Sequence, residues 1–190
     1  MVYVTGGEFK GRRLTAPPSI RPTEAKVRQA VFNILGSFIG GARVLDGYAG
    51  CGALGCEAIS RGAAFVAFIE QDPETALAIR ENLDRLGADV PRASWRLLQL
   101  EFTRGLEELA RTQAPFDVVL LDPPYGASEG KKALNALVQC AILAPAGVVV
   151  VEHERRTELP AIIGPLQQGS RHRYGDTVLS LYQASKPSHP

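Results

Sequence analysis

The feature that most constrains the fold is a regular alternation of short apolar runs with longer amphipathic stretches. The apolar runs are rich in Val, Ile, Leu and Phe, and they read ARVLD, AFVAFIE, SWRLLQL, FDVVLLD and GVVVVEH. Between them, helical stretches are predicted near residues 53–61, 73–86, 103–113 and 129–143. Because strands that alternate with helices form βαβ units, the sequence predicts an α/β fold with a parallel sheet covered on both faces.

Both ends of the chain depart from this alternation. Near the N-terminus, VYVTG and RRLTA flank GEFKG and predict a short hairpin, and RPTEAKVRQAVFNIL predicts a helix with Thr23 as its N-cap. Near the C-terminus, RHRYGD and TVLSLYQ predict two strands joined by a Gly-Asp turn. We therefore divide the chain into an extension at residues 1–40 and an α/β domain at residues 41–185.

The extension is basic, although the net charge of the whole chain is only +1. Residues 1–43 carry seven Lys and Arg side chains and two acidic ones, whereas the remainder has 14 basic and 18 acidic side chains. A basic edge on a mildly acidic body is typical of a protein that binds a polyanion such as nucleic acid. In the predicted helix, the apolar residues recur on one face, so we expect Lys26, Arg28 and Gln29 to face solvent or a ligand.

Composition indicates the cellular compartment of the protein and whether it binds a metal. The three cysteines form no CxxC pair and are too few for a disulfide framework, which favours a reducing compartment and indicates no zinc site. The N-terminal residues lack the apolar core of a signal peptide, and no run approaches the roughly 20 apolar residues that span a bilayer. We expect a cytoplasmic protein that needs no metal and no membrane.

A glycine-rich segment, LDGYAGCGALG, follows the first apolar run. Gly50, Gly52 and Gly55 form GxGxxG, and Glu70 lies 20 residues beyond Gly50, which is the pattern of a dinucleotide-binding turn. In a dehydrogenase the first glycine directly follows the strand and helps to bind a pyrophosphate. Here Asp46 ends the strand four residues earlier, and its carboxylate would repel a pyrophosphate.

A ligand that carries an ammonium group suits Asp46 better, because a charge-assisted hydrogen bond is then available. S-adenosylmethionine offers its methionine end to Asp46 and the glycine loop, and its ribose diol to Glu70. Glu101 follows the third apolar run, where a contact to adenine would fall. The predicted cofactor-binding residues are Asp46, Tyr48, Ala49, Gly50, Gly52, Glu70, Gln71 and Glu101.

The sequence Asp122-Pro123-Pro124-Tyr125 directly follows the fourth apolar run and predicts the reaction. An amino group conjugated to a base ring is a poor nucleophile because its lone pair is delocalised. If Asp122 and the carbonyl of Pro123 accept its two hydrogens, the nitrogen lone pair can point at a sulfonium methyl. Pro123 and Pro124 fix the backbone, and Tyr125 can stack on a base that has left its helix or loop. Cys51 is expected to pack beside the cofactor, and His153 to be a hydrogen-bonded wall residue.

Together these segments resemble a known family. GGEFKGRRL, RPTEAKVRQAVFNIL, LDGYAGCGALGCEAISRGA, FIEQD, FDVVLLDPPYG, VVVEH and RYGDT are similar to the bacterial 16S rRNA guanine-N2 methyltransferases of the RsmD type, within the S-adenosylmethionine-dependent amino-methyltransferases. The similarity extends over nearly the whole chain. One departure is Leu100-Glu101, which stands where Gly-Asp is usual.

The resemblance implies a Rossmann-like class I methyltransferase with a seven-stranded, mostly parallel sheet and an antiparallel last strand. It implies methyl transfer from S-adenosylmethionine to the N2 amino group of a guanine in 16S rRNA, with S-adenosylhomocysteine as the second product. The expected substrate is the small ribosomal subunit or an assembly intermediate, and the expected state is a monomer. The residues expected to contact RNA are Lys10, Arg12, Arg13, Arg21, Lys26 and Arg28.

Three alternatives stay open at this stage. The Asp-Pro-Pro-Tyr motif also occurs in DNA adenine-N6 and cytosine-N4 amino-methyltransferases, although an extension of about 40 residues is small for reading several base pairs. An NAD-dependent oxidoreductase would share the glycine pattern, but Asp46 argues against it. A non-catalytic RNA-binding assembly factor would keep the fold without needing the Asp122 motif.

Overall fold

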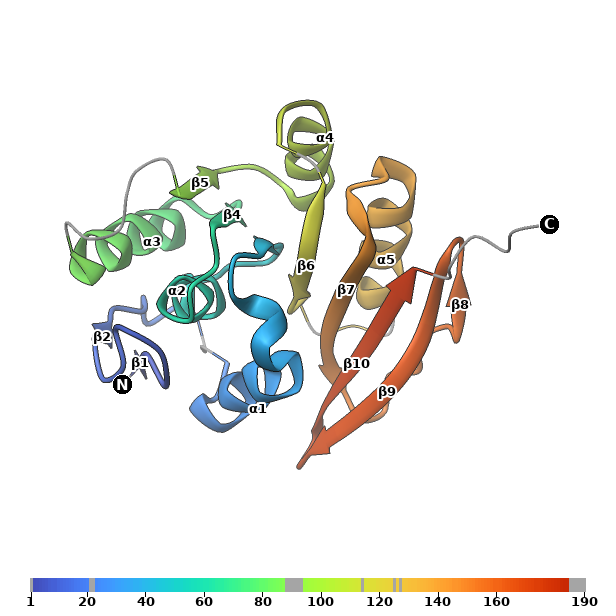
Figure 1. Cartoon of the computed structure of the whole chain (residues 1–190), viewed down its shortest axis with the longest axis horizontal. Coiled ribbons are helices and arrows are strands. Elements are labelled where there is room, and N and C mark those ends of the chain that lie inside the picture. The colour runs from blue at the N-terminus through green and yellow to red at the C-terminus, as the bar shows by residue number, and fades with distance from the viewer. Residues whose placement is uncertain are drawn as a thin grey trace.

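The computed structural model describes residues 2–20, 23–87, 94–113, 115–124, 126 and 128–184. Within these residues the main feature is an eight-stranded sheet in the order β5-β4-β3-β6-β7-β10-β9-β8 (Figure 1). The five strands from β5 to β7 are parallel, whereas β10 pairs antiparallel with both β7 and β9. The strands are β3 (Arg43–Asp46), β4 (Phe65–Ile69), β5 (Trp95–Leu98), β6 (Phe116–Leu121), β7 (Leu143–Glu154), β8 (Ile162–Ile163), β9 (Leu166–Tyr174) and β10 (Thr177–Ala184).

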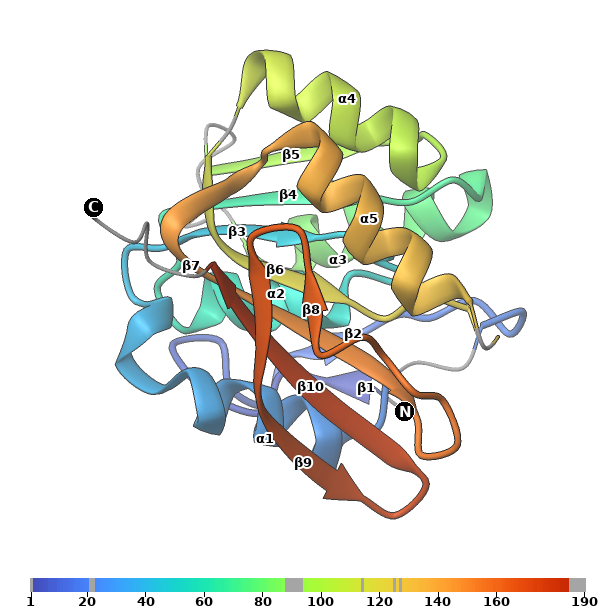
Figure 2. The same ribbon diagram turned by 90° about the vertical axis from the view of Figure 1, so that its right-hand side faces the viewer.

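Helices cover both faces of the sheet (Figure 2). Three of them share one buried apolar cluster with the residues that precede α1, and two share a second cluster on the opposite face. Successive strand residues alternate between the clusters, so Val118 and Leu120 face the first while Val119 and Leu121 face the second. The helices on the first face are α1 (Ala25–Leu35), α2 (Ala53–Ser60) and α3 (Pro73–Leu86), and those on the second are α4 (Phe102–Thr112) and α5 (Glu129–Cys140).

The predicted α/β fold is confirmed, including the C-terminal hairpin with its turn at Gly175 and Asp176 and the antiparallel β10. The two-residue β8 adds an eighth strand to the seven that the family resemblance implies. The last predicted helix was three residues too long, because β7 begins at Leu143.

The extension forms a two-stranded hairpin, β1 (Val2–Tyr3) and β2 (Arg13–Leu14), followed by α1 and the 3₁₀ turn η1 (Gly36–Ile39). The predicted hairpin is therefore confirmed. Thr23 was wrongly expected to cap α1, since the N-cap residue is Glu24 and makes no side-chain capping bond. The apolar residues of the extension join the same core cluster as α2 and α3, so the extension packs on the α/β domain. The domain boundary at residues 40 and 41 stays a prediction.

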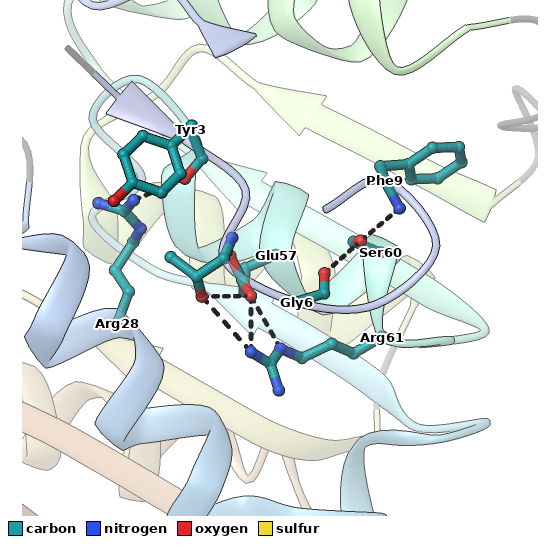
Figure 3. A network of polar contacts seen from close by, with 8 residues as sticks. Tyr3, Gly6, Phe9, Arg28, Glu57, Ser60 and Arg61 are labelled. Carbon is teal, nitrogen blue, oxygen red and sulfur yellow. Dashed lines mark hydrogen bonds and ion pairs between the residues drawn. The ribbon is translucent and has the colours of Figure 1, made fainter. Parts of the chain in front are cut away.

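Buried polar side chains of α2 hold the hairpin loop in place (Figure 3). Glu57 is fully buried, and its carboxylate accepts hydrogen bonds from the amide and hydroxyl of Thr5, each at 2.7 Å. The same carboxylate pairs with Arg61 at 2.8 Å. Ser60 accepts from the amide of Phe9 at 2.9 Å and donates to the carbonyl of Gly6 at 2.7 Å. These contacts fix the extension to the face of the sheet that α2 covers.

Arg28 does not face solvent, as the helical pattern predicted, because its side chain is only 2% exposed. Its guanidinium donates to the carbonyl of Tyr3 at 2.8 Å and to the carbonyl of Thr23. Burial lowers the pKa of Arg28 below its ordinary value, and the negative charge of Glu57 opposes that shift. Arg28 thus joins the hairpin to the start of α1, and its expected contact with RNA is withdrawn.

The other basic residues of the extension divide into two groups. Lys10, Arg13 and Lys26 are exposed, as a contact with a polyanion requires. Arg12 is also exposed, but its guanidinium donates to the carbonyls of Arg85 and Leu86 at 2.8 and 2.9 Å and so caps the end of α3. Arg21 lies outside the described residues.

Replacing Glu57 with alanine is expected to lower the free energy of unfolding by about 3–5 kcal/mol, because Arg61 loses its partner and the amide of Thr5 loses its acceptor. Urea denaturation measures the change. The matched control is Glu81→Ala on the exposed side of α3, which should change stability by no more than about 0.5 kcal/mol. An equal, small effect of both substitutions would contradict the structural role of Glu57.

Candidate active site

A cavity of about 430 Å³ lies at the carboxyl ends of the parallel strands, within the usual size range of ligand sites. Eight residues from the predicted cofactor and catalytic sets line it together, although they come from four separate segments of the chain. They are Tyr48, Ala49, Gly50, Glu70, Gln71, Glu101, Asp122 and Pro124. The carboxyl-end position is where open α/β sheets bind their ligands, so this cavity is the candidate active site.

The glycine loop after β3 owes its shape to backbone contacts. Gly50 has a positive φ of 52°, and its amide donates to the Glu70 carboxylate at 2.9 Å. The amide of Ala49 donates to the carbonyl of Ile69 at 3.0 Å. A side chain at Gly55 is excluded, because a Cβ there would lie 2.1 Å from the Phe68 ring. These contacts hold the loop against the end of β4, where the Glu70 carboxylate accepts the Gly50 amide.

Asp46 lies behind the loop and is not among the residues that line the cavity. It is 1% exposed, and its Oδ2 accepts a hydrogen bond from the amide of Gly55 at 2.8 Å. Burial raises the pKa of Asp46 to about 7, and the Gly55 bond opposes that shift. In this structure Asp46 orders the loop and the start of α2; its direct contact with a ligand ammonium stays a prediction. Gly52 is also buried and does not line the cavity.

Tyr48 and Glu101 line the cavity and contact neighbouring residues of the protein. The Tyr48 ring stacks on Phe102 with ring centres 4.4 Å apart, and burial raises the pKa of its phenol, which keeps it neutral. Glu101 is exposed and accepts hydrogen bonds from the amides of Thr103 and Arg104, so it caps α4. The stacked rings of Tyr48 and Phe102 suit the flat adenine ring. The contact of Glu101 with adenine stays a prediction.

Asp122, the first residue after β6, also lines the cavity. The hydroxyl of Thr23 donates to Asp122 Oδ2 at 3.0 Å. Burial raises the pKa of Asp122 to about 6, and the Thr23 bond opposes this shift because it stabilises the charged form. Pro123 is buried beside it, and Tyr125 lies outside the described residues. The cavity thus brings the glycine loop and the predicted catalytic motif together.

Two residues of the extension, Ile20 and Thr23, line the cavity and were missed by sequence reasoning. No local pattern marks a threonine that bonds a carboxylate 99 residues away. Asn82 of α3 makes a similar link, since it bonds the backbone of Thr15 in the extension and the carbonyl of Cys51 in the glycine loop. The extension is therefore part of the site, because it bonds Asp122 directly and is linked to the glycine loop through Asn82.

His153 is hydrogen-bonded as expected, whereas the packing of Cys51 beside the cofactor stays a prediction. Cys51 is buried and lines the cavity, and burial raises the pKa of its thiol to about 11, so it is not a thiolate nucleophile at neutral pH. His153 is hydrogen-bonded through one ring nitrogen to the carbonyl of Glu154 and through the other to the hydroxyl of Ser180. Among the residues that the structure describes, no cluster of His, Cys, Asp or Glu could hold a metal ion.

The strand order, with a glycine loop after the central β3 and an acidic residue after β4 and β6, defines a Rossmann-like class I methyltransferase fold. A protein of Thermus thermophilus described as hypothetical has the same fold with a TM-score of 0.81 and 30% identity, over 95% of this chain and 98% of that one. An RNA methyltransferase of Salinibacter ruber in complex with S-adenosyl-L-homocysteine matches with a TM-score of 0.65 and 16% identity, over 90% of this chain and 97% of that one.

Sequence comparison gives the family. Residues 2–183 match the family described as Conserved hypothetical protein 95, and the chain belongs to this family, which is the RsmD family. The ribosomal RNA small subunit methyltransferase D of Escherichia coli K12 is 32% identical over 96% of this chain and 89% of that protein. The protein of the same name from Haemophilus influenzae is 34% identical over 81% of this chain and 79% of its own length.

Replacing Thr23 with valine is expected to raise the pKa of Asp122 above about 6, because the lost hydroxyl bond favoured the ionised carboxylate. A carboxyl ¹³C NMR titration measures this, with the Asp122 resonance assigned by its loss in Asp122→Asn. The carboxylate should then ionise at a higher pH than in the wild type. An unchanged or lower value would show that Thr23 does not hold Asp122 in solution.

Proposed function

We propose that this protein transfers the methyl group of S-adenosylmethionine to the N2 amino group of a guanine in 16S rRNA. The observation that carries the proposal is one shared cavity, in which the glycine loop and Glu70 face Asp122 and Pro124. The relatives named ribosomal RNA small subunit methyltransferase D support the substrate class. The substrate we propose is the small subunit or an assembly intermediate, and we propose a monomer that acts in the cytoplasm. No helix in the described parts of the chain has the length and apolar character of a membrane span.

The residues of the cavity fit S-adenosylmethionine. The Glu70 carboxylate is half-buried at the end of β4 and is suited to accept from the ribose hydroxyls. The stacked pair of Tyr48 and Phe102, with Leu100, offers an apolar wall for the adenine ring. When bound, S-adenosylmethionine supplies an electrophilic methyl group on a sulfonium.

The catalytic contribution of the protein is alignment and control of one proton. Asp122 and the carbonyl of Pro123 accept the two hydrogens of the guanine amino group and so leave its lone pair free to attack. After transfer the amino nitrogen carries one proton too many. Asp122 is suited to take that proton, because burial places its pKa at about 6, closer to neutrality than an ordinary aspartate.

The experiment that tests this function uses methyl-labelled S-adenosylmethionine. Unmodified small subunits, protein-free 16S rRNA and duplex DNA are offered in parallel, and the labelled nucleoside is identified. Label in N2-methylguanosine from either ribosomal substrate supports the proposal. Label in DNA would favour a DNA amino-methyltransferase, and bound S-adenosylmethionine without any label would favour a non-catalytic assembly factor.

Asp122→Ala is expected to lower kcat at least about 10²-fold, the scale for losing one preorganised polar group in a transition state. Binding of S-adenosylmethionine, measured by calorimetry, should change less than threefold or so, since Glu70 and the loop stay intact. Equal losses of cofactor binding and turnover would contradict the role given to Asp122.

Reversing the charge of Lys10 and Arg13 together is expected to weaken RNA binding and to flatten its dependence on salt. The slope of log K against log salt should fall by up to about 2, because each lost phosphate contact removes about 0.7–0.9. These residues are preferred to Arg12, which caps α3. The control is Arg111→Glu at the end of α4, which should leave the slope unchanged. A wild-type slope in the double variant would exclude these two residues from the RNA interface.

A further inference from the structure

Glu152 follows Val151 on β7 and lies close enough to Asp122 for their charges to interact. It does not line the main cavity but a small second pocket, which it shares with Pro123 and Pro124 of the predicted catalytic motif. Leu121, the last residue of β6, is paired with Val151, so Asp122, which directly follows β6, is expected to lie next to Glu152. On its other side Glu152 is paired with Leu179 of β10.

Glu152 and Asp122 also share a face of the sheet. Leu120 and Val150 belong to the apolar cluster on the side of α1. The next residue of each strand, Leu121 and Val151, belongs to the cluster on the opposite face. Because side chains alternate along strands, Asp122 and Glu152 both face the side of α1. Thr23, which bonds Asp122, comes just before α1 on that same side.

The Glu152 carboxyl group is buried without the contacts that other buried acids have. Its Oε2 has no hydrogen-bond partner among the described residues, whereas Glu57 and Asp46 each accept from backbone amides. Burial raises the pKa of Glu152 to about 8, and the negative charges of Asp122 and Glu24 add to the shift. A buried carboxyl oxygen without a partner is costly, so a group that the described residues do not provide is expected to bond Oε2.

The position of Glu152 matters because the ring nitrogens next to the amino group are donors or acceptors depending on the base. In guanine one of the two ring nitrogens beside the N2 amine, N1, carries a hydrogen and is a donor, whereas N3 is an acceptor. In adenine and cytosine the ring nitrogen beside the amine is an acceptor. A carboxylate beside the group that binds the amine therefore suits guanine and opposes the other two bases.

We propose that Glu152 determines the base specificity of the enzyme by accepting the N1 hydrogen of the target guanine beside Asp122. The assignment rests on the proposed function. Three acceptors then match three hydrogens, with Asp122 and the Pro123 carbonyl on the N2 amine and Glu152 on N1. The N1 hydrogen stays on the base, and the carboxylate that receives it is ionised.

The charge state of Glu152 gives the proposal a pH signature. The charged groups that face it are Asp122 from β6 and Glu24 ahead of α1, and β10 presents the apolar Leu179. Because the pKa of Glu152 lies at about 8, the empty site holds a proton there at neutral pH, and guanine binding releases it to solvent. The catalytic efficiency on guanine should therefore rise between about pH 7 and 8.

The decisive experiment compares guanine with 2-aminopurine, which keeps the N2 amine but has an acceptor at N1. Each base is placed by splint ligation at the position that labelling has mapped, and the rRNA is assembled into small subunits. Wild-type enzyme should prefer guanine by about 10- to 100-fold in kcat/KM, as expected for one lost hydrogen bond to a charged group. Glu152→Gln should lose most of that preference, because its amide can accept from N1–H or donate to N1, and its pH profile between 7 and 8 should flatten.

Matched controls separate recognition from folding. Glu158→Gln, an exposed change just after β7, should keep the wild-type preference, and both variants should bind S-adenosylmethionine as the wild type does. A wild-type enzyme with no preference for guanine would overturn the assignment, as would a Glu152→Gln variant that keeps the full preference. Absence of label in guanine with the wild type would instead overturn the proposed function, and the assignment with it.

Discussion

The buried guanidinium of Arg28 is the contact on which the arrangement of the site depends. It bonds the carbonyls of Tyr3 and Thr23, and so fixes the N-terminal hairpin to the residue that precedes α1. The hydroxyl of Thr23 in turn bonds Asp122 at the end of β6. Three hydrogen bonds therefore link Tyr3 of the hairpin, through Arg28 and Thr23, to Asp122, the proposed catalytic carboxylate. Burying a guanidinium is costly, and the carbonyls that receive it offset that cost only when the hairpin and α1 are correctly placed.

A second set of contacts orders the glycine loop of the cavity. Asp46 orders the beginning of α2 through Gly55, and Glu70 holds the glycine loop through Gly50. Asn82 connects that loop to Thr15 of the extension. The extension thus touches both the cofactor loop and the catalytic motif. The surface proposed to bind RNA and the site proposed to bind S-adenosylmethionine are consequently parts of one packed unit, with shared apolar residues beneath them.

The sequence was sufficient where a physical rule is local. Buried parallel strands must be apolar throughout, which predicts β3, β4, β6 and β7, and the carboxyl ends of those strands predict where Glu70 and Asp122 meet. It failed where a contact joins distant segments. Helical periodicity places Arg28 on the polar face, yet the carbonyls of Tyr3 and Thr23 draw it inside. Thr23 has the residue type of an N-cap but donates to Asp122, 99 residues further along the chain.

The central claim is that one cavity holds S-adenosylmethionine with its reactive end toward Asp122. A crystal structure of the protein with S-adenosylhomocysteine tests this most directly. We predict that the ribose hydroxyls bond Glu70, that the adenine ring packs against Tyr48, Leu100 and Phe102, and that the sulfur faces Asp122 and Pro124. A ligand bound outside this cavity, or one inside it with the sulfur turned away from Asp122, would contradict the account.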